Sequence, residues 1–315
     1  MQWKVLISAP YFIPVADRFS SWFEENDIKV VIPPVQERLS EEELLGLIHD
    51  IHGVICGDDQ FTAQVLHAAP LLKVISKWGT GIDSIDVNIA KQLGILVCRT
   101  PNAFTDPVAD SVMAYTLSFA RNIVSMDGLM KSGIWKKVPG KALRESTIGV
   151  IGVGAIGGAV LFRAHAFGSR LFGNDIRDIG KERARELHVT MVSLEELLQE
   201  SDFVSINCDL NPTSYHIMNT ARFSLMKNSA YLINCSRGPC VDERALIEAL
   251  RTRQIAGAGL DVFEEEPLPM DSLLRRMSNV LLAPHSSNAS SSARERVHDN
   301  TLKQLLDGLR NPVRS

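Results

Sequence analysis

A glycine-rich turn constrains the fold of this chain more than any other feature. Gly152, Gly154 and Gly157 form its only Gly-x-Gly-x-x-Gly pattern, between the apolar run Ile148–Ile151 and the helix-like stretch Ala155–Phe167. Glycine lets the backbone turn tightly and approach a pyrophosphate, and the free amides at the start of the following helix face that anion. A strand, this turn and a helix in that order predict a dinucleotide-binding site.

An acidic residue further along the chain indicates which dinucleotide. Asp175 ends a second apolar run, Leu171–Asn174, and lies where its carboxylate would accept hydrogen bonds from the ribose hydroxyls. The same charge would repel the 2′-phosphate of NADP, so NAD is expected and NADP is disfavoured. Arg177, two residues on, is the one argument for NADP, and we interpret it as a solvated surface charge.

Length and composition indicate a two-domain protein whose partners are small molecules. A chain of 315 residues exceeds one typical domain, and 45% hydrophobic with 22% charged residues is ordinary for a globular protein. The net charge of -4 provides no basic surface for nucleic acid. No apolar run approaches the roughly 20 residues that span a bilayer, and the N-terminus lacks the form of a signal peptide. A cytoplasmic protein without membrane contact is expected.

The cysteines also indicate a reducing compartment. Their number is odd, and they show neither paired short spacings nor a histidine cluster: Cys56, Cys98, Cys208, Cys235 and Cys240. Neither a metal site nor a disulfide framework is predicted, and a reducing compartment fits.

Short apolar runs alternate with amphipathic segments in both halves of the chain. The predicted strands are Val5–Ser8, Lys29–Ile32, Gly53–Cys56, Leu72–Ser76 and Leu96–Cys98, then Ile148–Ile151, Leu171–Asn174, Phe203–Asn207, Ala230–Asn234, Gly257–Leu260 and Val280–Ala283. The alternation predicts an α/β protein with two Rossmann-like, doubly wound parallel sheets, the second with six strands. Between strands we expect a helix over Ser40–Ile51, opened by a capping box of Ser40 and Glu43. The last helix, Ser292–Leu309, is expected to return to the first domain.

An apolar arm joins the two predicted domains. A long helix over Asp106–Asn122 precedes the less regular stretch Ser125–Leu143, which contains Trp135. An exposed apolar segment of this kind predicts contact with a second subunit, and the alternative is an excursion that covers its own domain.

Three polar segments follow strand ends in the second half, where open α/β sheets bind ligands. They are Asn234–Gly238, Leu260–Pro267 and Ala283–Asn288. Together they supply an arginine, carboxylates and a histidine. Hydride transfer to a 2-oxo acid needs a guanidinium for the carboxylate and an acid–base group for the carbonyl oxygen, while a nicotinamide performs the redox step.

With these segments in view, the chain resembles the D-isomer-specific 2-hydroxyacid dehydrogenases, in the branch that includes phosphoglycerate dehydrogenase. The resemblance covers almost the whole chain, through five motifs in the family's order: Lys77–Asp86, the glycine turn with Asp175, Asn234–Asp242, Leu260–Pro267 and Pro284–His285.

The resemblance implies a catalytic set. Arg237 would hold the substrate carboxylate and polarise the carbonyl, and His285 would donate the proton in reduction and accept it in oxidation. Glu266 would hydrogen-bond His285 and favour its imidazolium form. Glu264 and Glu265 are expected to be solvated neighbours.

It also implies binding residues and a domain plan. The backbone amides of Trp78, Gly79, Thr80 and Gly81 would receive the substrate carboxylate as an anion nest. Cofactor contacts would come from Gly152, Gly154, Ala155, Ile156, Gly157, Asp175, Cys235, Ser236, Asp261, Ser286, Ser287 and Asn288. Residues 1–100 with 286–315 would form a discontinuous, flavodoxin-like substrate domain, and 101–285 the NAD-binding domain. A homodimer would be held by the arm around 122–145.

Two departures from the family pattern limit what is expected. Asn207–Asn211 replaces the usual His-x-Pro-Leu-Thr after the fourth strand, so contacts to the cofactor there would differ. Asp58 and Asp59 stand where a phosphate-binding arginine would be expected, and two carboxylates would repel a phosphate. A non-phosphorylated 2-hydroxy acid is therefore favoured over 3-phosphoglycerate.

Two alternatives share the fold. An NADH-sensing regulatory protein would bind the cofactor with weak or no turnover, but the intact set of Arg237, Glu266 and His285 argues against it. Formate oxidation involves no substrate hydroxyl to deprotonate, so a histidine paired with a glutamate argues against that reaction.

Overall fold

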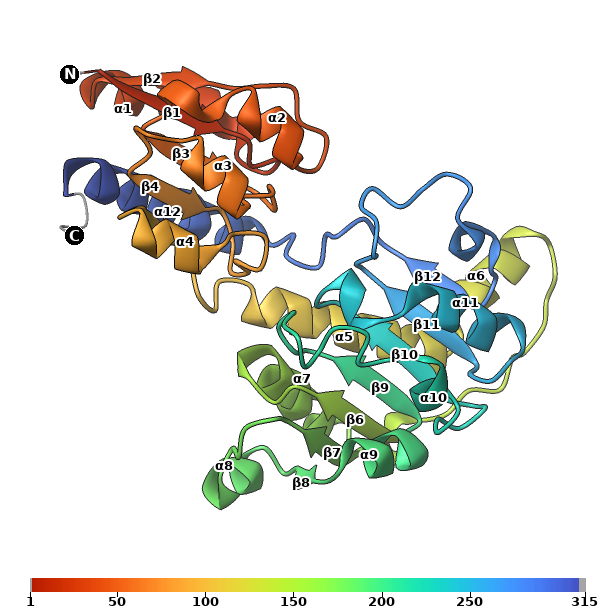
Figure 1. The fold of residues 1–315 in the computed structure, drawn as a ribbon. Helices are drawn as coiled ribbons and strands as arrows, with labels where there is room; N and C mark the ends of the chain where they lie inside the picture. The colour runs from red at the N-terminus through yellow and green to blue at the C-terminus, as the bar shows by residue number, and fades with distance from the viewer. Residues whose placement is uncertain (1, 312–315) are drawn as a thin grey trace. The chain divides into compact units, whose positions relative to one another are not determined.

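The computed structural model describes residues 2–311, which form two compact units. Unit 1 runs to Phe104 and resumes at Ser290, and unit 2 is Thr105–Ala289. Unit 2 thus begins and ends four residues later than the cofactor domain expected from the sequence. Each unit carries one parallel sheet, of five and seven strands, which confirms the predicted α/β fold class (Figure 1).

The sheet of unit 1 has the strand order β2-β1-β3-β4-β5. Its strands are β1 (Trp3–Ile7), β2 (Ile28–Val31), β3 (Gly53–Cys56), β4 (Val74–Lys77) and β5 (Leu96–Cys98). All pairs are parallel, and β3 and β4 are buried along their whole length. Parallel strands covered on both faces appear in the sequence as continuous apolar runs, which is why all five were predicted.

Helices and 3₁₀ turns complete unit 1. They are η1 (Ile13–Phe19), α1 (Ser20–Glu25), α2 (Glu41–Leu45), η2 (Ile48–Asp50), α3 (Ala63–His67), α4 (Val87–Gln92) and α12 (Ser291–Arg310). The capping box of Ser40 and Glu43 is confirmed, but the helix that it opens ends at Leu45, with Gly46 as its C-cap, instead of continuing to Ile51. The last helix does return to unit 1: α12 lies along β3 and β4, and the buried Ser76 hydroxyl donates to the Thr301 carbonyl at 2.9 Å.

The sheet of unit 2 has the order β12-β11-β10-β9-β6-β7-β8. Its strands are β6 (Thr147–Ile151), β7 (Arg170–Asn174), β8 (Thr190–Met191), β9 (Phe203–Ile206), β10 (Tyr231–Asn234), β11 (Gly257–Leu260) and β12 (Val280–Leu282). The six predicted strands are present, and the prediction of six was one short. The added strand, β8, has two residues, which is too short to show any periodicity.

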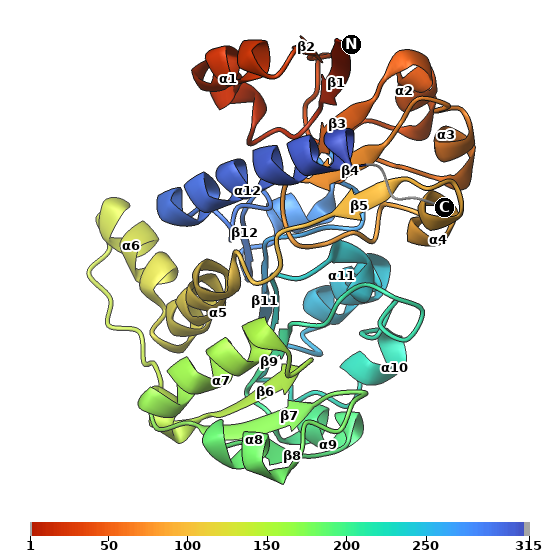
Figure 2. The same cartoon turned by 90° about the vertical axis from the view of Figure 1, so that its left-hand side faces the viewer.

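Helices cover both faces of this sheet. They are α5 (Thr105–Ala120), α6 (Ile123–Lys131), η3 (Leu143–Glu145), α7 (Ala155–Ala166), α8 (Lys181–Glu186), α9 (Leu194–Glu200), α10 (Thr220–Phe223), η4 (Gly238–Cys240), α11 (Glu243–Arg251) and η5 (Leu273–Arg276). Figure 2 shows α5 and α7 on one face, with α10 and α11 on the other. Strand order changes direction at β6 and β9, so the carboxyl ends of these strands form the switch point where such sheets bind ligands.

The arm differs from its prediction. Ile123–Lys131 is a helix, α6, separated from α5 by Asn122 in the left-handed conformation (φ 53°). None of its residues is buried, so the apolar side chains of α6 do not pack on the core of unit 2.

Within residues 2–311, no helix combines the length and the apolar character needed to cross a membrane.

Close approach of α9 to β6 depends on Gly149. A Cβ there would lie 2.5 Å from Leu197 Cδ2 and would also collide with Ser201 Oγ. We expect Gly149→Ala to lower the free energy of unfolding by about 2 kcal/mol through overpacking, measured by urea denaturation. Gly128→Ala is the matched control, because a Cβ on this helical glycine meets nothing within 4 Å and should be neutral or stabilising. Equal stability of Gly149→Ala and the wild type would show that the helix shifts at no cost.

Candidate active site

The glycine turn has the geometry of an anion cradle. Gly152 lies at φ +89°, and a Cβ there would lie 2.7 Å from the backbone nitrogen of Cys208, so the fold itself requires this glycine. Gly154 is different: its φ of -78° suits any residue, and a Cβ would meet only Arg177 Nη2, at 3.9 Å. The packing of the protein therefore leaves space beside Gly154, directly before the N-terminus of α7 at Ala155. This space, next to the amides at the start of α7, is where the sequence predicts the pyrophosphate.

Asp175 is turned toward this cradle. Its side chain is 5% exposed, Oδ2 accepts the Val153 amide at 2.8 Å, and Oδ1 accepts the Arg177 amide at 2.9 Å. Arg177 is 75% exposed and its Nε lies 3.5 Å from Asp175 Oδ1, so it is a surface charge that also neighbours the acid. An open pocket of about 490 Å³ adjoins the pair, with Ile176 and Val192 in its lining.

The turn after β10 presents Arg237. The Asn234 side chain shapes it: Oδ1 accepts the Ser236 amide at 3.1 Å, and Nδ2 donates to the Arg237 carbonyl at 2.9 Å. Gly238 follows, and a Cβ on it would overlap the backbone carbonyl of Phe263. Only glycine permits this approach, which places the segment that carries Arg237 against the segment that carries Glu266.

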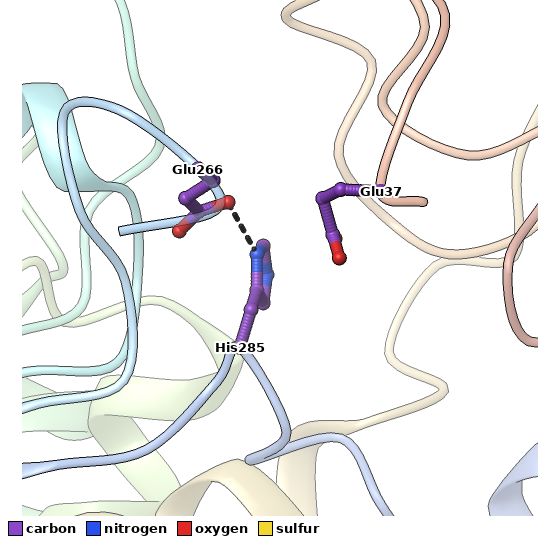
Figure 3. A group of neighbouring side chains, drawn as sticks. All are labelled: Glu37, Glu266 and His285. Carbon is purple, nitrogen blue, oxygen red and sulfur yellow. Dashed lines mark hydrogen bonds and ion pairs between the residues drawn. The ribbon is translucent and has the colours of Figure 1, made fainter. Parts of the chain in front are cut away.

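His285 and Glu266 form a hydrogen-bonded pair. His285 Nδ1 lies 2.9 Å from Glu266 Oε2, and both side chains are mostly shielded from solvent (Figure 3). The second carboxylate oxygen, Oε1, accepts the Phe263 amide at 2.9 Å, so the carboxylate is fixed at both ends. Such a bond assigns Nδ1 of the imidazole to the carboxylate and leaves proton transfer to Nε2.

Asp261 supports the loop on which His285 lies. The buried carboxylate accepts the amides of Ser286 at 2.8 Å and Ser287 at 2.9 Å, and the Asp261 carbonyl accepts the His285 amide at 2.7 Å. Expected as a cofactor contact, Asp261 thus also holds the histidine loop to the end of β11.

Two buried amide oxygens lie in segments expected to contact the cofactor. Asn288 Oδ1 and Asn207 Oδ1 have no hydrogen-bond partner within the described part of the chain. Buried polar atoms are normally paired, so each oxygen is suited to accept from a bound ligand. Asn207 is the residue that departs from the family pattern, and its Nδ2 donates to Ser205 Oγ at 2.9 Å.

Cys235 and Cys208, near this site, are packed inside the protein as thiols. Burial raises the pKa of Cys235 to about 12, and the hydrogen bond that Cys208 donates to Cys240, together with burial, raises the pKa of Cys208. Cys208 is therefore a packing residue and not a nucleophile.

Glu264 corrects one expectation. It is not a solvated neighbour, because its Oε1 lies 2.5 Å from His216 Nε2 and its side chain is 32% exposed. His216 itself was missed, since nothing in the sequence links two residues 48 positions apart.

The expected substrate loop of unit 1 needs a second correction. The Trp78 amide donates to the Cys56 carbonyl at 2.9 Å, so it is unavailable to a ligand, and the indole Nε1 donates to His298 at 2.9 Å. Burial, the largest cause, lowers the pKa of His298, so its ring is a neutral acceptor for the indole. The amides of Gly79, Thr80 and Gly81 donate to no acceptor within the described residues. Of the four amides expected to form an anion nest, these three remain as candidates and that of Trp78 does not.

The two aspartates near this loop do not act as the sequence suggested. Asp59 is fully buried and accepts the Leu39 and Gly57 amides and the Ser8 hydroxyl, at 2.6, 3.0 and 2.7 Å. Asp58 Oδ1 lies 2.9 Å from Lys77 Nζ. One carboxylate is internal and the other is paired with a cation, so the argument that both repel a phosphate is wrong.

Comparisons with known proteins agree with this geometry. Residues 113–287 match the family described as "D-isomer specific 2-hydroxyacid dehydrogenase, NAD binding domain". The chain is 40% identical to a glyoxylate reductase of Thermofilum pendens, over 85% of this chain and 81% of the relative. It is 39% identical to a D-3-phosphoglycerate dehydrogenase of Methanocaldococcus jannaschii, over 86% of this chain and 52% of the relative.

Solved structures extend the match to both units. The structure of the D-lactate dehydrogenase of Aquifex aeolicus complexed with NAD and lactic acid superposes with a TM-score of 0.85 at 26% identity, covering 98% of this chain and 95% of that one. From the cradle, the paired histidine and these similarities, the chain belongs to the D-isomer specific 2-hydroxyacid dehydrogenase family and is an NAD-dependent oxidoreductase acting on 2-hydroxy acids.

Proposed function

We propose that this protein reduces a small 2-oxo acid of the glyoxylate class with NADH. The His285–Glu266 pair, at 2.9 Å, is the observation that carries the proposal, because it supplies an oriented acid for a carbonyl oxygen. Relatives 40% identical to this chain are named glyoxylate reductases, which supports the size of the substrate. We also propose that the reaction takes place in the cytoplasm.

Each residue of the site has a separate role in the proposed reaction. Arg237 binds the substrate carboxylate through its planar guanidinium. His285 Nε2 gives its proton to the carbonyl oxygen, while Glu266 holds Nδ1 and balances the charge of the imidazolium. Bound NADH supplies the hydride.

Residues of unit 2 would hold the cofactor. The amides of Ala155 and Ile156 would bind the pyrophosphate beside Gly154, and Asp175 would accept from the adenosine ribose. Cys235, Ser236, Asp261, Ser287 and Asn288 would contact the nicotinamide end. The substrate domain is then unit 1.

The proposal is tested by steady-state assays of the purified protein. Glyoxylate, hydroxypyruvate, pyruvate and 3-phosphohydroxypyruvate are offered with NADH and with NADPH. We expect turnover with NADH on the small acids. Absence of turnover on every 2-oxo acid, with NADH binding that changes the assembly, would instead identify a regulatory protein.

His285→Ala is expected to lower kcat by about a thousandfold, within the range for loss of a general acid. Glu266→Gln keeps the shape and removes the charge, and should lower kcat by about tenfold to a hundredfold while the alkaline limb of the pH–rate profile moves to lower pH. Glu265→Gln is the matched control, because Glu265 is exposed in the same turn. Wild-type turnover by His285→Ala on an accepted substrate would refute its role in proton transfer.

Asp175→Asn is expected to weaken NADH binding about tenfold, because the amide carries no charge to complement the ribose hydroxyls and holds the Val153 amide less well. NADPH binding should change little, so the preference for NADH over NADPH becomes smaller. Titrations that follow cofactor fluorescence measure the dissociation constants of both cofactors. Glu182→Gln, an exposed carboxylate on α8, is the control. An unchanged ratio of NADH to NADPH affinity would show that Asp175 does not select the cofactor.

We also propose that the arm forms a homodimer. Ile123, Val124 and Met130 on α6 are each 52% exposed, and Trp135 beyond it is 81% exposed. Large apolar side chains that are this exposed on one segment are usually covered by a partner. A second copy of the chain is the occupant that the 2-hydroxyacid dehydrogenase fold implies.

The dimer is tested by sedimentation velocity. The wild type is expected to sediment at twice the chain mass of 34.8 kDa. The double variant Ile123→Asp/Trp135→Asp should sediment as a monomer, since two charges would be buried without partners. Met270→Asp alters a residue that is 83% exposed outside the arm and should leave the dimer intact. A wild type that is monomeric at all concentrations would exclude the arm as an interface.

A further inference from the structure

We propose that His216 is a positioning residue that ties the segment carrying Arg237 to the segment carrying Glu266, and so sets the geometry of proton transfer. The inference rests on the proposed function for its kinetic readout, and its geometry lies entirely within unit 2. His216 touches neither substrate nor cofactor in this proposal. It acts through Glu264.

The imidazole of His216 reaches the acidic turn of residues 263–266. Its Nε2 lies 2.5 Å from Glu264 Oε1. Two residues later Glu266 bonds His285, and its other oxygen accepts the Phe263 amide, so the turn is closed on itself. A displacement of Glu264 is therefore passed to the carboxylate that orients the catalytic imidazole.

The backbone of His216 reaches the other segment. Its amide donates to the Pro239 carbonyl at 2.9 Å, and the Met218 amide donates to the Cys240 carbonyl at 3.0 Å. Residues 216–218 thus pair with the stretch just after Arg237. Gly238, within that stretch, lies flush against the Phe263 backbone. His216 bridges two segments that already touch, with its ring on one and its main chain on the other.

The conformation of His216 indicates that this bridge is imposed by its contacts. The residue lies at φ +47°, in the left-handed region that a non-glycine residue rarely adopts. Its ring is also stacked on Tyr215, with centroids 4.1 Å apart and planes 15° apart. The backbone bond to Pro239 and the ring bond to Glu264 together hold it there.

The carboxylates around this turn explain why Glu264 needs a hydrogen-bond partner. Glu264, Glu265 and Glu266 are consecutive, and the Glu264 amide donates to the carboxylate of Glu243 at 3.4 Å. Burial, aided by the charges of Glu264 and Glu265, raises the pKa of Glu243. Glu266 is paired with His285, and His216 is paired with Glu264. Without His216, a half-buried carboxylate would face like charges, and the turn would move to relieve the repulsion.

The test uses the full-length protein and three substitutions. His216→Phe keeps a ring and removes the bond to Glu264, and His216→Gln keeps an N–H donor. His165→Phe on α7 is the matched control, because His165 is an exposed histidine of the same unit. The readouts are kcat, KM, the pH–rate profile, NADH affinity and the melting temperature.

We expect His216→Phe to lower kcat by about tenfold, with NADH affinity unchanged, because catalysis is sensitive to a small misplacement of an acid. The alkaline limb of its pH–rate profile should move to lower pH, because a displaced Glu266 would stabilise the imidazolium form of His285 less well. His216→Gln should recover most of both effects. Wild-type kcat and pH profile in His216→Phe, or a lower melting temperature alone, would overturn the proposal.

Glu264→Ala covers the case in which His216→Phe fails to fold. It removes the same bond from the other side and should reproduce the kinetic loss. The double variant Glu264→Ala/His216→Gln should lose no more than Glu264→Ala alone, since both changes act on one interaction. Additive losses would contradict coupling through this pair.

A measurement without turnover separates this inference from the proposed function. Ring signals of His285 are followed by NMR as pH is varied, in the wild type, His216→Phe and His216→Gln. A wild type that turns over no 2-oxo acid while the His285 titration moves in His216→Phe would refute the function and keep the positioning role. An active wild type with an unmoved His285 titration in His216→Phe would refute the positioning role alone.

Discussion

The bond between Glu266 and the Nδ1 atom of His285 is the interaction on which the rest of the site depends. An imidazole can donate a proton from a defined position only if its other nitrogen is held. Glu266 does this with one oxygen and is itself held by the Phe263 amide through the other. Asp261 fixes the loop of His285 through three backbone amides. The imidazole of His285 is thus held by Glu266, and Glu266 is in turn held by the Phe263 amide.

Glycines allow these segments to approach one another. Gly238 brings the turn of Arg237 against the acidic turn, and Gly152 brings the cofactor cradle against the segment after β9. In both places a Cβ would meet backbone atoms, which cannot yield as a side chain can. Gly154 is the exception, because the space beside it is not filled by the protein. The same residue type therefore serves packing at two positions, and at the third it leaves space that the proposed function assigns to a ligand.

Most of the fold could be predicted because its signals are local, and the catalytic roles of Arg237, Glu266 and His285 stay a prediction. Buried parallel strands are apolar runs, and Arg237, Glu266 and His285 each follow a strand end. What was missed depends on long-range contacts or on very short elements. The two residues of β8 show no period, α6 has no buried face, and His216 meets Glu264 only after folding. Asp59 reads as a surface acid in the sequence, although three hydrogen bonds hold it in the interior.

Asp175 shows how the cofactor site is prepared before any ligand binds. One of its oxygens accepts the Val153 amide within the glycine turn, and the other accepts the Arg177 amide just beyond β7. A carboxylate oxygen has two lone pairs, so Oδ2 keeps capacity for a ribose hydroxyl, while Oδ1 also lies 3.5 Å from Arg177 Nε. The acid that we expect to select the dinucleotide therefore also joins β7 to the turn that would bind the pyrophosphate. Because the two parts of the site share this residue, the conformation that binds the ribose is the one that forms the cradle, and little ordering is left to oppose binding.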